Sequence, residues 1–270
     1  MTEQMLTQKC NGFRMHARSV FRCVFRWLRE RLGIRDFRGH SFFGVLLSQP
    51  AVVADFGAHR GEFFSALKSE YSISRAMLIE ANPRLAERLK ETLGTEADVV
   101  HAALVGGNRG ATILFTRSSE PEASSIFREC AAAYGITDQL DVPAMDLSKV
   151  IRELGGRVDL AKFDVEGAEV DVLQTASASD LASCGQLTVE FHDMTPPITR
   201  SDVDRVYRRL RSEGYGVVNV NWPQVDDVLF VNLKTMPAAK RMAFRFRLAL
   251  ANALFITRRV IFDRSSLKRI

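Results

Sequence analysis

The chain has 270 residues, of which 37 are Lys or Arg and 32 are Asp or Glu, so its formal net charge is +5. Apolar residues make up 46% and charged residues 26%, which are the proportions of an ordinary globular protein. The composition therefore excludes a disordered chain, a collagen-like repeat and a disulfide scaffold. The length suits one large α/β domain with extensions, or two small domains.

The charge is divided unevenly along the chain. Residues 1–40 carry a net +6, residues 41–233 carry −10 and residues 234–270 carry +9. Asymmetry of this kind predicts that the ends and the middle meet different partners. We expect a basic amphipathic helical extension at residues 1–47, a central domain at 48–235 and a second basic helical extension at 236–270.

The first predicted element is an amphipathic helix over residues 13–32. Apolar residues recur every three or four positions from Phe13 to Leu32, and arginines recur at the same interval from Arg14 to Arg29. Each series therefore lies on its own face of a helix, which Gly33 would end. Because arginines interrupt it throughout, the stretch lacks the apolar core of a signal peptide.

The middle of the chain alternates predicted strands and helices. The strands cover Ala51–Asp55, Ala76–Glu80, Asp98–Val105, Ala111–Thr116, Val158–Asp164, Gln186–Phe191, Gly216–Val220 and Val228–Leu233. The helices cover Glu62–Tyr71, Pro83–Leu93, Asp146–Leu154, Ala168–Thr175 and Arg200–Glu213. This alternation indicates an α/β fold with a mostly parallel sheet and helices on both faces.

The four cysteines are scattered and show no metal-ligand spacing. This argues against a zinc site and a disulfide framework and favours a reducing compartment, so we expect a cytoplasmic protein. The longest apolar run of the basic C-terminal segment, residues 248–256, is too short to span a bilayer.

A glycine-containing turn follows the first predicted strand of the middle region. The run Asp55-Phe-Gly57-Ala58-His59-Arg60-Gly61 leads from that strand into a helix, and Glu80 ends the next strand. A carboxylate there can accept hydrogen bonds from ribose hydroxyls. The spacing matches neither the dinucleotide fingerprint nor a P-loop, and Asp55 would repel phosphate but tolerate a sulfonium. This combination favours S-adenosylmethionine over NAD; the alternative is a glycine turn that binds nothing.

Four further motifs follow the turn after Asp55: Ile79-Glu80-Ala-Asn82-Pro83, His101-Ala-Ala103, Ser124-Ser125 and, most specific, Lys162-Phe-Asp164-Val-Glu166-Gly-Ala-Glu169. Together with that turn, they give the chain a resemblance, from Val52 to Leu233, to the FkbM family of class I S-adenosylmethionine-dependent methyltransferases. It implies a Rossmann-like seven-stranded sheet with a reversed last strand, and methyl transfer to a hydroxyl of a sugar or polyketide. It also implies the cofactor contacts Asp55, Gly57, Ala58, His59, Gly61, Glu80, Asn82, Ala103, Ser125 and Asp164. The family often has Asn where this chain has His59.

Three of the predicted parallel strands end in acidic residues, Asp55, Asp164 and Glu190, which therefore lie together along the carboxyl-end edge of the sheet. Methyl transfer from a sulfonium requires alignment of the acceptor, exclusion of water and removal of the acceptor proton. His192, with an ordinary pKa of about 6.5, is our candidate general base, with Asp164 as the alternative and Glu190 beside them. Glu166 and Glu169 are candidate substrate contacts, or structural acids at a helix start. We expect no metal, although such acids could instead hold a divalent cation.

The two basic ends form a second kind of candidate site. Residues 13–32 and 240–270 mix cationic and apolar side chains, so they could lie on anionic lipid headgroups at the inner face of the membrane. Alternatively, their apolar faces pack on the domain and their charges are solvated. The acidic middle and the lack of a known module argue against nucleic acid as a partner.

The leading hypothesis is a methyltransferase that O-methylates a hydroxyl of a small molecule, glycan or glycolipid. One alternative is a methyltransferase that acts on an amine. The other is a non-catalytic adaptor that keeps the fold at the membrane surface. The sequence does not indicate an oligomeric state.

Overall fold

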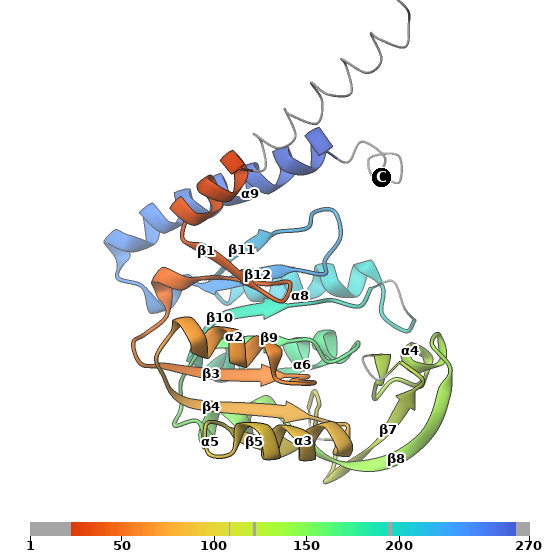
Figure 1. Ribbon diagram of the computed structural model, residues 1–270. Helices are drawn as coiled ribbons and strands as arrows, with labels where there is room; N and C mark the ends of the chain where they lie inside the picture. The colour runs from red at the N-terminus through yellow and green to blue at the C-terminus, as the bar shows by residue number, and fades with distance from the viewer. Residues whose placement is uncertain (1–22, 108, 121–122, 194–195, 263–270) are drawn as a thin grey trace, which may run out of the picture.

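The computed structural model describes residues 23–107, 109–120, 123–193 and 196–262 (Figure 1). Within the first predicted helix, residues 23–31 are helical. The remainder of that prediction, residues 13–22, lies outside the described residues. The same holds for residues 263–270 of the predicted C-terminal extension.

The centre of the fold is a seven-stranded sheet with the order β11-β12-β10-β9-β3-β4-β5. Its strands are β3 (Ala51–Phe56), β4 (Ile73–Glu80), β5 (Asp98–His101), β9 (Val158–Phe163), β10 (Cys184–Val189), β11 (Tyr215–Asn219) and β12 (Val228–Asn232). β12 runs antiparallel to both of its neighbours, and the other neighbouring pairs are parallel. The predicted α/β class, the parallel sheet and the reversed last strand are therefore confirmed.

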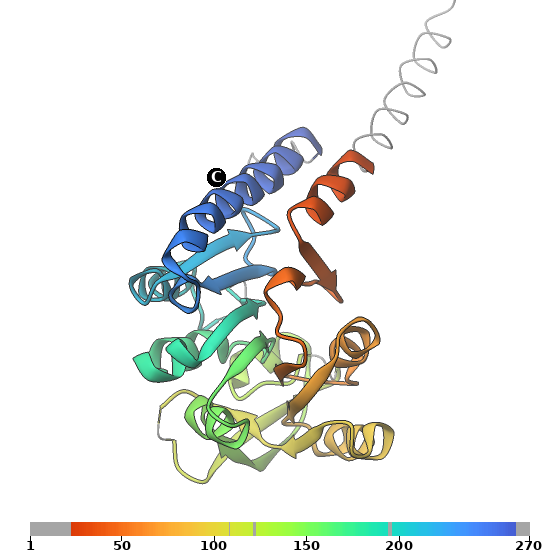
Figure 2. The same ribbon diagram turned by 90° about the vertical axis from the view of Figure 1, so that its left-hand side faces the viewer.

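Helices cover both faces of this sheet, so strands such as β3 and β9 are buried along their whole length (Figure 2). One face packs against α2 (Glu62–Glu70), α3 (Pro83–Leu93) and α9 (Ala238–Phe262). The other packs against α5 (Leu147–Glu153), α6 (Glu169–Thr175), α7 (Ala178–Ser183) and α8 (Arg200–Ser212). Alternate residues of β3 point to opposite cores, as strand geometry requires: Val53 to the first and Val52 to the second.

A second, three-stranded sheet was only partly anticipated. It has the order β6-β8-β7, made by β6 (Ala103–Leu104), β8 (Ile136–Met145) and β7 (Thr112–Ser118), and it projects beside the short helix α4 (Arg128–Ala132) (Figure 1). The predicted strand Asp98–Val105 was wrong in extent, because it divides between β5 and β6. β8 was missed because it is largely exposed, polar and interrupted by Pro143, so its sequence lacks the apolar alternation of a strand.

The sequence did not reveal an N-terminal hairpin, which forms a separate two-stranded sheet and contacts β10 and β12. It consists of β1 (Ile34–Phe37) and β2 (His40–Phe43), followed by a 3-10 turn at Gly44–Leu46. The side-chain amide of Gln186 on β10 accepts from Phe43 N at 2.8 Å and donates to Phe43 O at 3.2 Å, so it imitates a strand partner. The buried Asp227 carboxylate accepts from Ser41 N and Ser41 Oγ. These bonds fix the position of His40.

The long helix α9 packs one side on the sheet. Phe244, Leu248, Ala251 and Phe255 are buried in the same core as the sheet, and Phe25 contacts Phe255 edge to face with ring centroids 5.5 Å apart. The described parts of both basic ends therefore bury apolar side chains against the domain. A short 3-10 turn, Leu233–Thr235, leads from β12 into this helix. The domain limits at residues 47 and 235 remain predictions.

α9 offers a matched pair of phenylalanines that tests this packing. Phe255 is 2% exposed and Phe246 is 68% exposed. We expect Phe255→Ala to lower the free energy of unfolding by about 3–5 kcal/mol, as is typical of a buried Phe, and Phe246→Ala to change it by about 0.5 kcal/mol or less. Urea denaturation of both variants measures this difference. Equal effects would mean that this face of α9 is not part of the core.

Candidate active site

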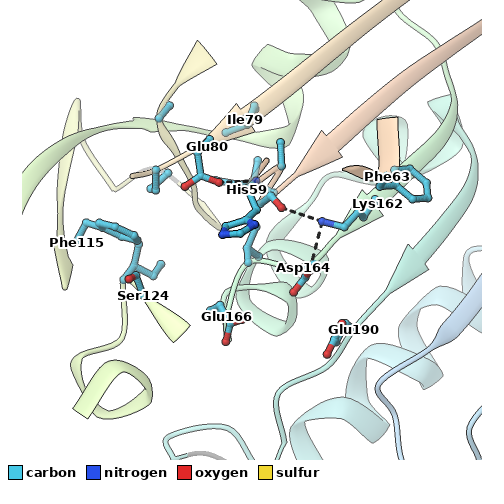
Figure 3. A pocket seen from close by; sticks show the side chains of 18 of the residues that line it. His59, Phe63, Ile79, Glu80, Phe115, Ser124, Lys162, Asp164, Glu166 and Glu190 are labelled. Carbon is cyan, nitrogen blue, oxygen red and sulfur yellow. Dashed lines mark hydrogen bonds and ion pairs between the residues drawn. The ribbon is translucent and has the colours of Figure 1, made fainter. Parts of the chain in front are cut away.

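The carboxyl ends of β3, β4, β9 and β10 surround a cavity of about 510 Å³ (Figure 3). This volume lies within the range of small-molecule sites, and the position is where ligands bind in open α/β sheets. Eight of the predicted site residues line it: Gly57, Ala58, His59, Glu80, Ala103, Asp164, Glu166 and Glu190. The other predicted residues are outside the lining: Asp55, Gly61, Asn82, Ser125, Glu169 and His192.

The buried ammonium of Lys162 organises one side of the cavity. Lys162 on β9 lies opposite Asp55 on β3 in the parallel register, and its Nζ is 3.3 Å from Asp55 Oδ1 and 3.3 Å from Asp164 Oδ2. The same Nζ donates to Gly57 O at 2.8 Å. Burial lowers the pKa of Lys162, but Asp55 and Asp164 outweigh burial and raise it. Lys162 is therefore a permanent cation that joins the ends of two strands.

Asp55, predicted to contact the cofactor, is fully buried behind this cation. Among the described residues its carboxylate receives the ion pair with Lys162 but no hydrogen bond. Its buried negative charge depends on Lys162 for compensation, because an uncompensated buried charge is costly. The structure thus places Asp55 as the partner of Lys162 and outside the cavity lining.

Two glycines of the turn after β3 are required by packing. Gly57 has a φ of +74°, and a Cβ there would lie 1.7 Å from Asp164 O. Gly61, the N-cap of α2, has a φ of +73°, and a Cβ there would lie 2.8 Å from Leu89 Cδ2. A side chain at Gly57 would therefore push apart the two loops that form the cavity floor.

Glu80 at the end of β4 is held by backbone amides. Its Oε2 accepts from His59 N and its Oε1 from Asn82 N, both at 2.8 Å, while Asn82 Oδ1 caps α3 by accepting from Arg84 N. Burial raises the pKa of Glu80, and the two backbone donors oppose that shift. Each carboxylate oxygen retains a lone pair, so Glu80 can still accept hydrogen bonds from a ligand in the cavity.

His192, the candidate general base, lies among acids. Its Nδ1 is 3.0 Å from the buried Glu169 Oε1, and its Nε2 is 3.3 Å from Glu166 Oε2 and 3.9 Å from Asp164 Oδ1. Burial lowers the pKa of His192, but Glu169 and the other acids outweigh it and raise the pKa to about 10. His192 is therefore an imidazolium at neutral pH, with no lone pair to take a proton.

Glu169 is held by the turn before α6. Its Oε1 accepts from Val165 N at 2.9 Å, and Gly167 N lies within hydrogen-bond distance of both carboxylate oxygens. Because the side chain is fully buried and outside the cavity lining, Glu169 orients His192 and this turn. Of its two predicted roles, the structure favours the structural one.

Three of the acids that line the cavity, Asp164, Glu166 and Glu190, differ in ionisation. Burial raises the pKa of Asp164, but Lys162, His40 and His192 together bring it below its ordinary value. Burial and neighbouring acids raise the pKa of Glu166 to about 8 and that of Glu190 to about 7. Asp164 is therefore a fixed anion, whereas Glu166 and Glu190 titrate near neutral pH.

Ser124 lines the cavity, whereas the predicted cofactor contact Ser125 does not. Ser125 Oγ donates to Glu166 O at 2.6 Å and accepts from Phe127 N at 3.0 Å. Ser125 thereby supports the backbone of Glu166, whose φ of +51° is uncommon for a non-glycine residue.

Several lining residues were not among the predicted site residues. They include Arg38, His40, Phe63, Phe115 and Lys162. His40 Nε2 lies 3.6 Å from Asp164 Oδ2, although 124 positions separate them. No local pattern marks His40, because the N-terminal hairpin brings it to the strand ends. Lys162 is part of a motif but was given no role in the site, although a lysine inside a buried parallel strand requires an acidic partner.

The rim also contains two groups that could offer ligands to a metal ion. Among the described residues, each group offers three ligand atoms that lie within 4.8 Å of one another. One group is His40, Asp164 and Glu190, and the other is Asp164, Glu166 and His192. Two cationic side chains, Lys162 and His192, already face Asp164 at 3.3 and 3.9 Å. That no metal is needed remains a prediction.

The strand order with a reversed last strand, and a cavity at the carboxyl ends of its parallel strands, define the class I methyltransferase arrangement. A family model described as the methyltransferase FkbM domain matches residues 55–217, which is more than half of the chain. The chain belongs to this family and is an S-adenosylmethionine-dependent methyltransferase.

The chain is also similar to individual proteins. It is 29% identical over 211 residues to the AMB antimetabolite synthetase AmbE of Pseudomonas aeruginosa. The match covers 64% of this chain and 10% of that protein, so the chain spans about a tenth of that relative's length. A solved methyltransferase FkbM from Methylobacillus flagellatus has 15% identity and a TM-score of 0.48, covering 73% of this chain and 48% of that chain. The M. capricolum protein TrmK, solved with S-adenosyl-homocysteine, has 7% identity and a TM-score of 0.37, covering 73% and 70%.

The residues present fit this cofactor. The cavity combines a buried carboxylate, Glu80, which has free lone pairs, with an apolar wall that includes Ile79, Ala103, Phe115 and Ile126. A ribose and an adenine need these two kinds of surface. The fixed anion Asp164 on the same lining suits a positively charged sulfonium.

Gly57→Ala tests whether the close approach of the two loops builds the site. We expect at least about a tenfold loss of S-adenosylmethionine affinity, because the new Cβ displaces the loop of Asp164. Gly156→Ala is the matched control: its φ is +85°, but no atom lies within 4 Å of its Cβ position. Isothermal titration measures both affinities. If the two variants bind equally well, the close approach is not required.

The raised pKa of Glu166 predicts a pH-dependent stability. A folded-state pKa of about 8 against an ordinary 4.5 means that its contribution to stability is lost as the pH rises through this interval. In cofactor-free protein, wild type should lose more free energy of unfolding between about pH 5 and about pH 8 than Glu166→Gln. The exposed substitution Glu87→Gln should follow wild type. Parallel curves for all three proteins would refute a buried, titrating Glu166.

Proposed function

We propose that this methyltransferase O-methylates a hydroxyl of a glycan, glycoconjugate or related small molecule. The observation that carries the proposal is that Glu166 and Glu190, two carboxyl groups that titrate near neutral pH, line the same cavity as Glu80. A hydroxyl must lose its proton as the methyl group is transferred, so it needs a base with a pKa near the working pH. Carboxylates also accept hydrogen bonds from the neighbouring hydroxyls of a sugar.

In this proposal the residues at the ends of β3 and β4 would hold the cofactor. Glu80 would accept hydrogen bonds from its ribose hydroxyls, and the apolar wall around Phe115 and Ile126 would contact its adenine. When bound, S-adenosylmethionine supplies an activated methyl group on a sulfonium. The protein orients the acceptor oxygen in line with that group and excludes water from the cavity.

We assign the general base to Glu190, one of the three predicted catalytic residues. His192 is protonated at neutral pH, and Lys162 and the histidines hold Asp164 as a weakly basic anion. Glu190 lines the cavity, and its pKa of about 7 matches the requirement of a general base. Its proton would come from the acceptor hydroxyl as the new C–O bond forms.

Glu166 and His192 form the acceptor side of this arrangement. The imidazolium of His192 lies 3.3 Å from Glu166 Oε2 and is itself held by Glu169. Glu166 lines the cavity, whereas His192 does not. We therefore propose that Glu166 binds an acceptor hydroxyl and that His192 positions Glu166.

Glu190→Gln tests the assigned base. Amide replacement keeps the shape but removes the basic oxygen, so we expect kcat to fall by about 10²–10⁴-fold while S-adenosylmethionine affinity is retained. In wild type kcat should rise with pH through about 7, because the base must be deprotonated, and level off above it. Measuring kcat against pH for wild type, Glu190→Gln and Glu87→Gln separates this role from a general charge effect. A wild-type rate in Glu190→Gln would remove Glu190 as the base.

An acceptor screen tests the substrate class. Radiolabelled methyl transfer to free sugars, glycolipids and amines should favour hydroxyl acceptors. Preferential methylation of an amine would replace the proposal with the amine alternative. Cofactor binding without turnover on any acceptor would support the non-catalytic adaptor.

A further inference from the structure

The outer face of α9 exposes a continuous apolar stripe. Five large side chains on this face are exposed: Met242 (79%), Phe246 (68%), Leu250 (45%), Ile256 (40%) and Val260 (43%). Ala249 and Ala253, also exposed, lie between them. At 3.6 residues per turn, these positions fall within about 120° of the helix circumference. They lie opposite the buried residues Phe244, Leu248, Ala251 and Phe255, so α9 has two apolar faces and only one is covered by the domain.

Cationic side chains border this stripe on both sides. α9 contains Lys240, Arg241, Arg245, Arg247, Arg258 and Arg259, and its 25 residues include no Asp or Glu. By helical geometry, Arg245 lies along one edge and Arg247 and Arg258 lie along the other. Arg245 and Arg258 are exposed, whereas Arg247 is half-buried with its guanidinium 5.6 Å from the centre of the Phe244 ring.

The helix of residues 23–31 lies beside α9 (Figures 1 and 2). Phe25 fixes the contact by packing on Phe255, and Arg258 lies over the Phe25 ring at 4.9 Å. The same stretch exposes Val24 (46%) and Trp27 (54%). Tryptophan is the residue most typical of the boundary between lipid and water.

We propose that α9 and residues 23–31 form a docking surface for an anionic lipid bilayer, into whose headgroup region the apolar stripe inserts. The charge identifies the occupant, because every charged side chain of α9 is cationic, and an apolar stripe among cations complements a surface that is apolar inside and anionic outside. A second copy of this chain fits less well, since a symmetric contact would bring two sets of six cations together. Among the described residues, no helix is long and apolar enough to cross a membrane, so the binding would be peripheral.

Vesicle co-sedimentation of the full chain tests the proposal without depending on the acceptor. Wild type should bind vesicles of phosphatidylcholine with phosphatidylglycerol and should bind pure phosphatidylcholine at least about tenfold more weakly, with an affinity that falls as salt rises. Equal binding to both vesicles, or no binding to either, would overturn the proposal.

Paired variants identify the face. Phe246→Ser combined with Leu250→Ser should weaken binding by about tenfold or more, because less apolar area enters the interface. The matched control is Leu114→Ser with Tyr134→Ser, which alters exposed apolar residues elsewhere. Arg245→Glu should also weaken binding, and Arg88→Glu on α3 should not.

Two further measurements keep the result interpretable. Thermal unfolding and S-adenosylmethionine titration should be the same in the stripe variant as in wild type, since these residues touch neither the core nor the cavity. Light scattering should show that wild type does not associate as its concentration rises. If wild type does associate and the stripe variant does not, the stripe is an interface between copies of the chain and the lipid proposal fails. If vesicle binding is lost while cofactor binding is retained, the surface is assigned independently of the proposed reaction.

Discussion

The buried ammonium of Lys162 is the interaction on which the rest of the site depends. This one buried cation pairs with Asp55 on the neighbouring strand and with Asp164 at the end of its own strand, and it donates to the backbone of Gly57. Removing one partner of such a group leaves an uncompensated buried charge, which typically costs about 3–5 kcal/mol. The two loops are therefore held together electrostatically, at a point where Gly57 allows their backbones almost to touch.

The ionisation of the cavity follows from this arrangement. Asp164 forms an ion pair with Lys162 and remains an anion. Glu166 and Glu190, which also line the cavity, are therefore partly buried beside a fixed negative charge. Their pKa values rise toward neutrality for that reason. The positively charged imidazolium of His192 partly offsets the negative charge of these acids, and the buried Glu169 holds it in place. The acidic middle of the sequence thus becomes a set of carboxyl groups with distinct protonation states.

The sequence predicted the parallel sheet well, because buried strands and amphipathic helices alternate with clear turn signals between them. The motif around Asp55, Glu80 and Asp164 also placed the cavity at the correct strand ends. The arm β7–β8 was incompletely predicted, since an exposed polar strand such as β8 is stabilised by its partner and not by its own pattern. His40 could not be found, because only the tertiary contact of the N-terminal hairpin brings it to Asp164.

The protonation of His192 illustrates a different limit. Sequence identifies a histidine with an ordinary pKa near neutrality, but three carboxylates from the segment 164–169 surround it in the fold and raise that pKa. Likewise, the pattern of α9 suggested either membrane contact or packing on the domain. The helix packs one apolar face on the sheet and exposes a second one. The sequence pattern had been interpreted as one or the other, and not as both on a single helix.

The most direct test of this account is S-adenosylmethionine titration of the double variant Asp55→Asn with Lys162→Met. The two substitutions remove both members of the buried ion pair together, so the chain is expected to unfold cooperatively like wild type, but the tie from Lys162 to Gly57 O and Asp164 is gone. The account predicts that affinity for the cofactor falls by about tenfold or more. A folded double variant that binds S-adenosylmethionine as tightly as wild type would contradict it.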